Sequence, residues 1–334
     1  MTPSPLLAAV EAIDVWRFQI HPEVWLLVGS LVALYVYAVR VVGPKVVPEG
    51  QPVITGRQRA AAIAGIVLLW LASDWPMHDI GEEYLYVVHM VQHTILTLVV
   101  PPLALIATPR WLADLVLGQG RVRRVVRIAS LPVVAGIAYN VAIMGGHWPA
   151  LVNASVEIGP LHYVVHVVLV ATAVMMWMPI CGPVAEWRIS PPAQMVYLFL
   201  MSIVPTVPGG WLTFADNAVY TAYDTPQRAF GISVVDDQQA AGAFMKISAG
   251  SWLWVIITGM FFVWAFRHQR EEAARDRARL ARVPVPAGTA PAPAEGEADG
   301  DAPTSSALTY EHVAQAFAET DPPPEPPSPP APPG

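Results

Sequence analysis

Histidine is the residue type in this sequence whose spacing could do chemistry. Two pairs, His89 with His93 and His162 with His166, are each separated by four positions. On a helix this separation puts both imidazoles on one face, with Cβ atoms about 5 to 6 Å apart, so each pair can chelate one metal ion. A single histidine inside a membrane helix is commonly a hydrogen-bonding contact between helices. Two such pairs together favour ligation of a metal or cofactor, because a neutral imidazole is the form that binds a transition metal.

The ligand types narrow the choice of metal without deciding it. Imidazole suits copper, zinc, iron and nickel, whereas thioether sulfur favours Cu(I). We expect Met90, Met144 and Met245 in the same layer as the histidines, although methionine is more commonly core filler. Asp236 and Asp237 begin the last apolar segment. Acidic residues are favourable at the positive end of a helix dipole, and this alone can account for both. Asp237 is kept as a candidate metal ligand.

The rest of the chain must hold these side chains in an apolar environment. Of its 334 residues, 54% are hydrophobic and only 13% are charged, and the mean hydropathy is +0.45. This balance is unusual for a soluble domain and typical of a membrane protein. The net charge of −7 comes mostly from the outer loops and the C-terminal tail, and it gives no signal for nucleic-acid binding. The sequence predicts an all-α, polytopic bundle of membrane helices.

A window of about 20 residues, the length that crosses a bilayer, finds seven candidate membrane helices. The third contains Pro101-Pro102 and the sixth contains Pro205 and Pro208, so both are expected to bend or break. The N-terminus has no basic region, and its apolar run is too short for a cleaved signal peptide. We expect an outer segment over 1–22, a seven-span domain over 23–266, and an inner flank with its tail over 267–334. The predicted helices are 23–42, 59–75, 83–107, 125–145, 160–181, 192–213 and 239–266.

The positions of lysine and arginine indicate an orientation. With the N-terminus outside and the C-terminus inside, sixteen of the nineteen Lys and Arg residues fall on the inner side, as the positive-inside rule requires. From about residue 283 the composition turns to Pro, Ala, Glu and Asp, which predicts a disordered tail. In this orientation seven of the nine histidines lie in the outer loops or in the outer half of a span: His21, His78, His89, His93, His147, His162 and His166.

Several common catalytic and redox patterns are missing from the sequence. Cys181 is the only cysteine, so there is no disulfide, no CxxC pair and no thiolate metal site. There is likewise no P-loop, no GxSxG and no HExxH motif. The corresponding classes of enzyme and redox protein are therefore excluded.

Separate motifs follow one order along residues 16–266: Trp16-Arg17, His21-Pro22, His89-Met-Val-Gln92-His93, Pro101-Pro102, Thr108-Pro109, His147-Trp-Pro149-Ala-Leu151, Leu161-His162-Tyr-Val-Val-His166 and Asp237-Gln238-Gln239-Ala-Ala-Gly242. In that order the chain resembles the CtaG-type cytochrome c oxidase assembly factors of bacteria. Two positions depart from the family's pattern. Gly146, where the family usually has Trp, precedes His147, and Lys246 stands in the last span where an apolar or aromatic residue is expected.

The resemblance implies a multi-spanning protein of the bacterial cytoplasmic membrane that is not an enzyme. Such a protein helps to mature the copper-containing core of a haem-copper terminal oxidase by handling copper at the outer face of the membrane. The implied partners are the subunits of that oxidase and membrane lipid, with a periplasmic copper chaperone as a candidate donor. The metal site implied by the motifs comprises His89, His93, His162, His166, His147 and Asp237.

Two other function classes stay open on the sequence. A haem-binding electron carrier would use one histidine from the third span and one from the fifth as axial ligands, although both pairs lie at about the same depth rather than several turns apart. A transporter for copper or another cation would use the broken third and sixth helices as its path. Such a path needs polar residues below His93 and His166, where the sequence is apolar.

Overall fold

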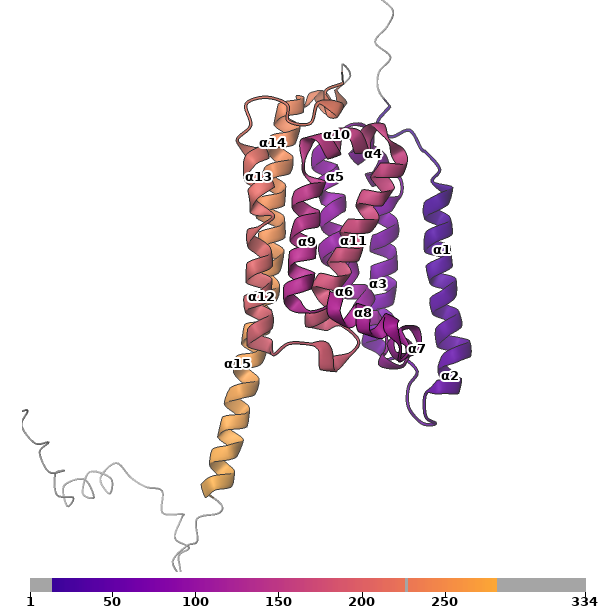
Figure 1. Cartoon of the computed structure of the whole chain (residues 1–334), viewed down its shortest axis with the longest axis vertical. Helices are drawn as coiled ribbons and strands as arrows, with labels where there is room; N and C mark the ends of the chain where they lie inside the picture. Colours follow the sequence, from indigo (N-terminus) through magenta and orange to yellow (C-terminus); the bar gives the residue numbers. More distant parts are fainter. Residues whose placement is uncertain (1–13, 226–227, 281–334) are drawn as a thin grey trace, which may run out of the picture. The chain divides into compact units, whose positions relative to one another are not determined.

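The computed structural model describes residues 14–225 and 228–280, and within these ranges it consists of helices joined by turns and loops (Figure 1). The described residues do not include the expected disordered tail. Of the expected N-terminal segment, 1–22, they include only 14–22. The α-helices are α1 Pro22–Tyr37, α2 Gly43–Val46, α3 Gly56–Ser73, α4 Met77–Glu83, α5 Tyr86–Thr94, α6 Val100–Ala107, α7 Arg110–Leu117, α8 Arg121–Ala129, α9 Pro132–Gly146, α10 Pro149–Glu157, α11 Gly159–Cys181, α12 Pro191–Ile203, α13 Thr206–Thr213, α14 Val234–Phe244 and α15 Gly250–Leu280. π-Helical turns at Ala38–Val42, Ile95–Val99 and Met245–Ala249 join successive helices, and short 3-10 turns occur at Ala185–Trp187, Thr221–Tyr223 and Ala229–Gly231.

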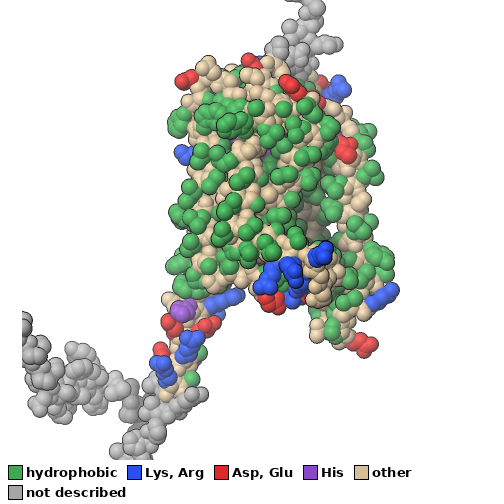
Figure 2. Space-filling model, in the orientation of Figure 1, with side chains coloured by type: hydrophobic (Ala, Val, Ile, Leu, Met, Phe, Trp, Pro, Cys, Tyr) green, Lys and Arg blue, Asp and Glu red, His purple; other side chains and the backbone are tan. Residues whose placement is uncertain are grey.

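Six helical stretches are long and apolar enough to cross a membrane, and the bent pair α8 and α9 raises the number to seven. This confirms the predicted all-α membrane bundle with about seven spans. Figure 2 shows hydrophobic side chains over the flank of the bundle and charged side chains mostly at its two ends, the distribution that a bilayer requires. The six stretches are Pro22–Val46, Gly56–Glu83, Tyr86–Ala107, Gly159–Cys181, Pro191–Thr213 and Val234–Arg279.

The predicted fourth helix, 125–145, is wrong at its start. The chain bends by 69° between α8 and α9, so residues 125–129 belong to a separate helix. Pro132 explains the break, because proline disfavours helical geometry in the residue before it, and Leu131 is extended at φ −62° and ψ 134°. α8 combines exposed apolar side chains with four arginines, as helices that lie at a membrane surface do. The apolar residues are Val122, Val125 and Ile128, and the arginines are Arg121, Arg123, Arg124 and Arg127.

The prolines of the third span are accommodated without a chain break. Pro101 and Pro102 lack N–H groups, so the carbonyls of Thr97 and Leu98 lose their helical partners. The indole of Trp177 donates to the Thr97 carbonyl at 3.1 Å, and that of Trp252 donates to the Leu98 carbonyl at 3.3 Å. Neighbouring helices thus supply the missing hydrogen bonds.

The sixth span breaks at the predicted place. α12 ends at Ile203 and α13 begins at Thr206, on either side of Pro205. α13 then packs against α14 (Figure 1). At Gly242 an added Cβ would lie 2.5 Å from the carbonyl oxygen of Gly209, so only glycine permits this backbone contact.

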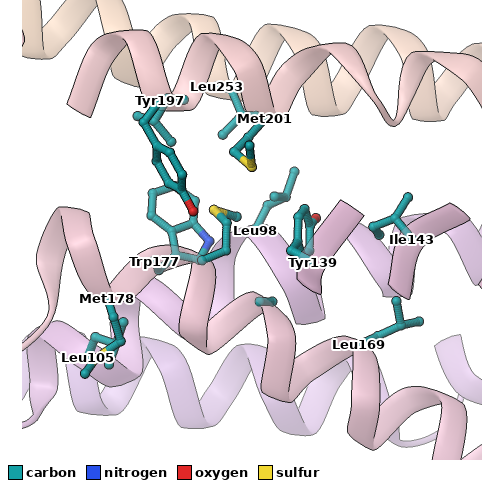
Figure 3. Close-up of a cluster of buried hydrophobic side chains, with 13 residues drawn as sticks. Leu98, Leu105, Tyr139, Ile143, Leu169, Trp177, Met178, Tyr197, Met201 and Leu253 are labelled. Atoms are coloured by element: carbon teal, nitrogen blue, oxygen red, sulfur yellow. The ribbon is translucent and has the colours of Figure 1, made fainter. Parts of the chain in front are cut away.

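The main apolar core fills the middle of the bundle. In Figure 3, Tyr197 and Met201 of α12 and Leu253 of α15 face Trp177 of α11 and Leu98 of the π-helical turn before α6. Each of these five residues is at most 7% exposed to solvent. The core therefore closes the bundle between its two ends, and it positions α9, α11 and the π-helical turn that follows α5 relative to one another. Its buried members are Leu98, Leu105, Tyr139, Ile143, Leu169, Ala173, Met176, Trp177, Met178, Tyr197, Leu198, Met201 and Leu253.

Candidate metal centre

All seven histidines expected at one side of the membrane meet at one end of the bundle, which we call the histidine end. Five elements bring them there: the residue before α1, then α4, α5, the end of α9 and the start of α11. Their rings form one connected set of neighbours, with centroids no more than 6.4 Å apart from one to the next. The members are His21, His78, His89, His93, His147, His162 and His166.

The two HxxxH pairs face each other across α5 and α11. Nε2 of His93 lies 3.3 Å from Nε2 of His166. Within the pairs, ring centroids are 4.3 Å apart for His89 and His93 and 4.4 Å apart for His162 and His166. Ligand atoms of His89, His93 and His166 all lie within 4.8 Å of one another, so three imidazoles from two helices converge on one point. We call the four residues the histidine cluster.

A carboxylate that the sequence analysis did not select sits against this cluster. Oε1 of Glu82 accepts a hydrogen bond from His89 Nδ1 at 2.8 Å and lies 3.1 Å from His162 Nε2. Glu82, His162 and His166 form a second group with ligand atoms within 4.8 Å. One negative charge beside four imidazoles would offset the charge of a bound cation. Glu82 precedes His89 by seven residues, a spacing that would place both on one face of a continuous helix. The helix is not continuous here, because α4 ends at Glu83 and α5 begins at Tyr86.

His147 lies beside the histidine cluster rather than within it. Its ring centroid is 6.4 Å from that of His93. Nδ1 contacts the carbonyl oxygen of Ile143 at 2.7 Å; because a carbonyl only accepts, Nδ1 carries the proton and Nε2 keeps a free lone pair. That Nε2 is buried and has no hydrogen-bond partner among the described residues. A hydrogen bond from the other ring nitrogen, as here, orients a histidine for metal binding.

Sulfur also lines the cavity next to His147. A space of about 40 Å³ is bordered by both His93 and His147 and by three methionines. The expectation for the methionines is met in part. Met144 is 39% exposed and lies elsewhere, whereas Met201 takes part instead; the three are Met90, Met201 and Met245.

The expected metal role of Asp237 does not agree with its contacts. Its two carboxylate oxygens accept the backbone N–H groups of Tyr86 at 2.7 Å and of Val87 at 3.0 Å. These are unpaired donors of the first turn of α5, so Asp237 caps a helix that lies about 150 residues earlier in the chain. Gln238 is likewise used structurally, because its amide oxygen accepts the N–H groups of Val219 and Tyr220.

Lys246 and the nearby Asp236 do not form an ion pair with each other. Asp236 is exposed and bonds to the Ser233 hydroxyl at 2.6 Å. The Lys246 side chain is itself exposed on the flank of the last span, where its long stem can carry the ammonium toward the membrane surface.

Comparison with known proteins identifies one family. The model of the family described as "Cytochrome c oxidase caa3 assembly factor" matches residues 33–267. This range holds six of the seven histidines of the histidine end, all but His21. Comparison with curated proteins and with solved structures gives no match. Because the matched range covers more than half of the chain, the protein belongs to the family of cytochrome c oxidase caa3 assembly factors.

Proposed function

We propose that the protein binds copper as cargo in the histidine cluster and hands it on during assembly of a haem-copper oxidase. The observation that carries this proposal is the 3.3 Å separation between Nε2 of His93 and Nε2 of His166. Nitrogen ligands at about 2.0 to 2.1 Å from a tetrahedral ion lie about 3.3 to 3.4 Å from each other. The two imidazoles therefore already have the separation that one shared ion requires.

The donor set favours copper over other metals that histidine binds. Beside the histidine cluster, the thioethers of Met90 and Met245 line the same cavity as His93 and His147. Thioether sulfur is a soft ligand, and together with imidazole it suits Cu(I). The family's description as an oxidase assembly factor agrees with copper, because copper belongs to the core of the oxidases that such factors mature.

The haem-carrier alternative is disfavoured by the space around the histidines. The two cavities that touch the cluster hold about 40 Å³ and 20 Å³, whereas pockets for cofactors and similar ligands measure about 300 to 1,000 Å³. His93 and His166 are also too close together for a macrocycle to lie between them. The space beside the histidines suits an ion rather than a haem.

The transporter alternative is disfavoured by the core below the cluster. Leu98, Met176 and Trp177 are at most 3% exposed, and they lie on the continuation of the helices that carry the histidines. A cation path through the bundle would need polar groups or water at this depth. We therefore propose a binding and delivery role, without catalysis, at the outer face of the bacterial cytoplasmic membrane, with oxidase subunits as receivers and a periplasmic copper chaperone as donor.

The test is copper binding by purified protein. Affinity for Cu(I) is measured by competition with a coloured chelator under reducing conditions, and bound metal by elemental analysis. His93→Gln should lower the affinity by about tenfold or more, since even changes next to metal ligands have effects of about 10- to 100-fold. His268→Gln is the matched control, because His268 is half exposed on α15 and contacts only Glu272 and Trp264 among the described residues.

A cellular assay separates copper handling from structural support. His93→Gln protein should stay abundant in the membrane while oxidase activity falls, and added copper should restore part of that activity by mass action. A variant lacking all four cluster histidines that binds copper as the wild type does would overturn the proposal. So would equal losses of protein abundance and oxidase activity with no response to copper.

A further inference from the structure

A cavity lined mainly by arginines lies at the end of the bundle opposite the histidine end. It holds about 420 Å³, whereas the two cavities beside the histidines hold about 40 Å³ and 20 Å³. Pockets for small ligands measure about 300 to 1,000 Å³. Figure 2 shows Lys and Arg side chains gathered at this end, where Figure 1 places α7 and α8. We call it the arginine cavity, after Arg110, Arg123, Arg124 and Arg127 in its lining.

Two of the four arginines are held by carboxylates. Arg110 binds Asp114 and Glu186, each at 2.6 Å. Arg123 binds Asp114 at 2.8 Å, and its guanidinium carbon lies 5.5 Å from the centre of the Trp187 ring, a cation–π distance. These contacts fix both side chains in the wall of the cavity and offset their charge.

The other two arginines of the cavity are not offset in this way. Arg124 and Arg127 have no ion-pair partner within the described ranges, and their separation of three positions puts them on one face of α8. Four arginines against the carboxylates of Asp114 and Glu186 leave a net charge of +2. Guanidinium groups bind phosphate through paired N–H donors. The cavity therefore has the charge and the donors for a phosphate group.

The opposite face of α8 shows which kind of phosphate can reach the cavity. Val122, Val125 and Ile128 are each at least 51% exposed, and α8 is bent by 69° away from α9. An amphipathic helix of this kind lies at the boundary between acyl chains and headgroups, with its apolar side chains in the membrane. A phospholipid presents its phosphate at that depth, and its acyl chains cover the apolar side chains that a soluble anion would leave exposed.

We propose that the arginine cavity binds the phosphate of an anionic phospholipid from the leaflet at this end of the bundle, with Arg124 and Arg127 as its principal partners. The acyl chains follow the apolar face of α8. Because Glu186 and Trp187 also line the cavity, the lipid joins α8 to the loop between α11 and α12. This inference goes beyond the proposed function and does not depend on copper.

The simpler explanation is that these arginines only orient the chain in the membrane, as basic residues on the inner side do. That role needs positive charge but no cavity, so every arginine of α8 would serve it equally. Arg121 is exposed on the same helix and is not part of the cavity lining. Arg121→Gln therefore makes the same change of charge outside the cavity, and it is the matched control.

The experiment titrates purified, full-length protein with phosphatidylglycerol and counts the bound lipids by native mass spectrometry. Phosphatidylcholine with the same acyl chains is the neutral comparison, and it should bind more weakly. Arg124→Gln and Arg127→Gln should each lower the affinity for phosphatidylglycerol by about fivefold, the effect of one basic residue near an anionic membrane surface. Arg121→Gln should bind phosphatidylglycerol as the wild type does.

The remaining outcomes separate a lipid site from its alternatives. Unchanged affinity in Arg124→Gln and Arg127→Gln would overturn the site, and so would an equal loss in Arg121→Gln, which would assign the binding to surface charge in general. Displacement of phosphatidylglycerol by inorganic phosphate at a similar concentration would overturn the lipid in favour of a free anion. If the glutamine variants fail to insert, Arg124→Lys combined with Arg127→Lys keeps the charges that orient the chain. The affinity should still fall in that variant, because lysine lacks the paired donors of arginine.

Discussion

Nε2 of His93 on α5 lies 3.3 Å from Nε2 of His166 on α11, so the two helices present their imidazoles to one point. If both nitrogens bind the same ion, the effects of removing them cannot be independent. Each single replacement, His93→Gln or His166→Gln, should lower Cu(I) affinity by about tenfold or more. The double replacement should lower it by less than the product of the two. Chelator competition measures all four proteins of the cycle, and strictly multiplicative losses would show that the two residues serve different ions or none.

Asp237→Asn should reduce stability rather than copper binding. The amide keeps one acceptor oxygen, so one of the two N–H groups at the start of α5, on Tyr86 or Val87, loses its charged partner. The loss should be about 1 to 3 kcal/mol, as for other buried hydrogen bonds to charged groups. Thermal unfolding of the detergent-solubilised protein measures this.

The neighbouring carboxylate provides the control for that prediction. Asp236→Asn changes an exposed side chain that bonds only to Ser233, so its effect should stay within about 0.5 kcal/mol. Both variants should still fill with copper at saturating concentration. Loss of copper from Asp237→Asn at unchanged stability would return Asp237 to the ligand set.

Gly242→Ala should disrupt the packing of α13 on α14. The added methyl group would lie 2.5 Å from the Gly209 carbonyl oxygen and 2.7 Å from the Thr213 nitrogen, and backbone atoms cannot move aside as a side chain can. Overpacking of this kind has an effect of about 1 to 3 kcal/mol or more. Gly250→Ala is the matched control in the same span, because nothing lies within 4 Å of its added Cβ. Equal yields and unfolding temperatures for the two variants would contradict this account.

Acid should loosen the contact between α7 and α8 at the end of the bundle opposite the histidine end. The Arg123 and Arg110 guanidinium groups hold the pKa of Asp114 below its ordinary value of 3.8, with contacts of 2.8 Å and 2.6 Å. A carboxylate whose folded-state pKa is lowered stabilises the fold above its unfolded value, and this contribution is lost as the pH falls through the folded value. Amide hydrogen exchange in α7 and α8 should therefore speed up below about pH 4, from the pKa shift of Asp114.

The size of this effect is limited because the group is largely exposed. Asp114→Asn should remove the acid dependence and lower stability at neutral pH by less than about 1 kcal/mol. Glu186→Gln is the control, since among the described residues Glu186 contacts only Arg110 and does not join the two helices. An unchanged acid response in Asp114→Asn would show that other groups hold α7 to α8.

The spans and the histidine pairs could be predicted because each depends on local sequence. A bilayer demands about 20 apolar residues in succession, and a helix puts residues i and i+4 on one face, so His89 and His93 were identified without any tertiary information. Two pairs at one depth can bind one ion only if α5 and α11 turn them toward each other, and that rotation is visible only in the structure. The bend before Pro132 was missed, because the apolar run continues across it and hydropathy does not register direction.

The remaining parts of the site depend on how helices rotate and pack. Met90 and Met144 both lie at the right depth, but Met90 faces the cavity while Met144 is 39% exposed, and depth alone does not fix the facing of a side chain. Glu82 reaches the cluster from a separate short helix. Asp237 has the sequence signature of a residue at a helix start, and that signature is the same whether it caps its own helix or another one.

The cap on α5 also bears on the order of synthesis. The first turn of the helix that carries His89 and His93 is held by Asp237, which leaves the ribosome about 150 residues later. Until the last span enters the membrane, the start of α5 lacks the acceptors for two of its N–H groups, and such unpaired helix ends fray. A nascent chain therefore has the imidazoles but not the firm geometry that joins them. The geometry of the two imidazoles is therefore fixed only when the chain is complete.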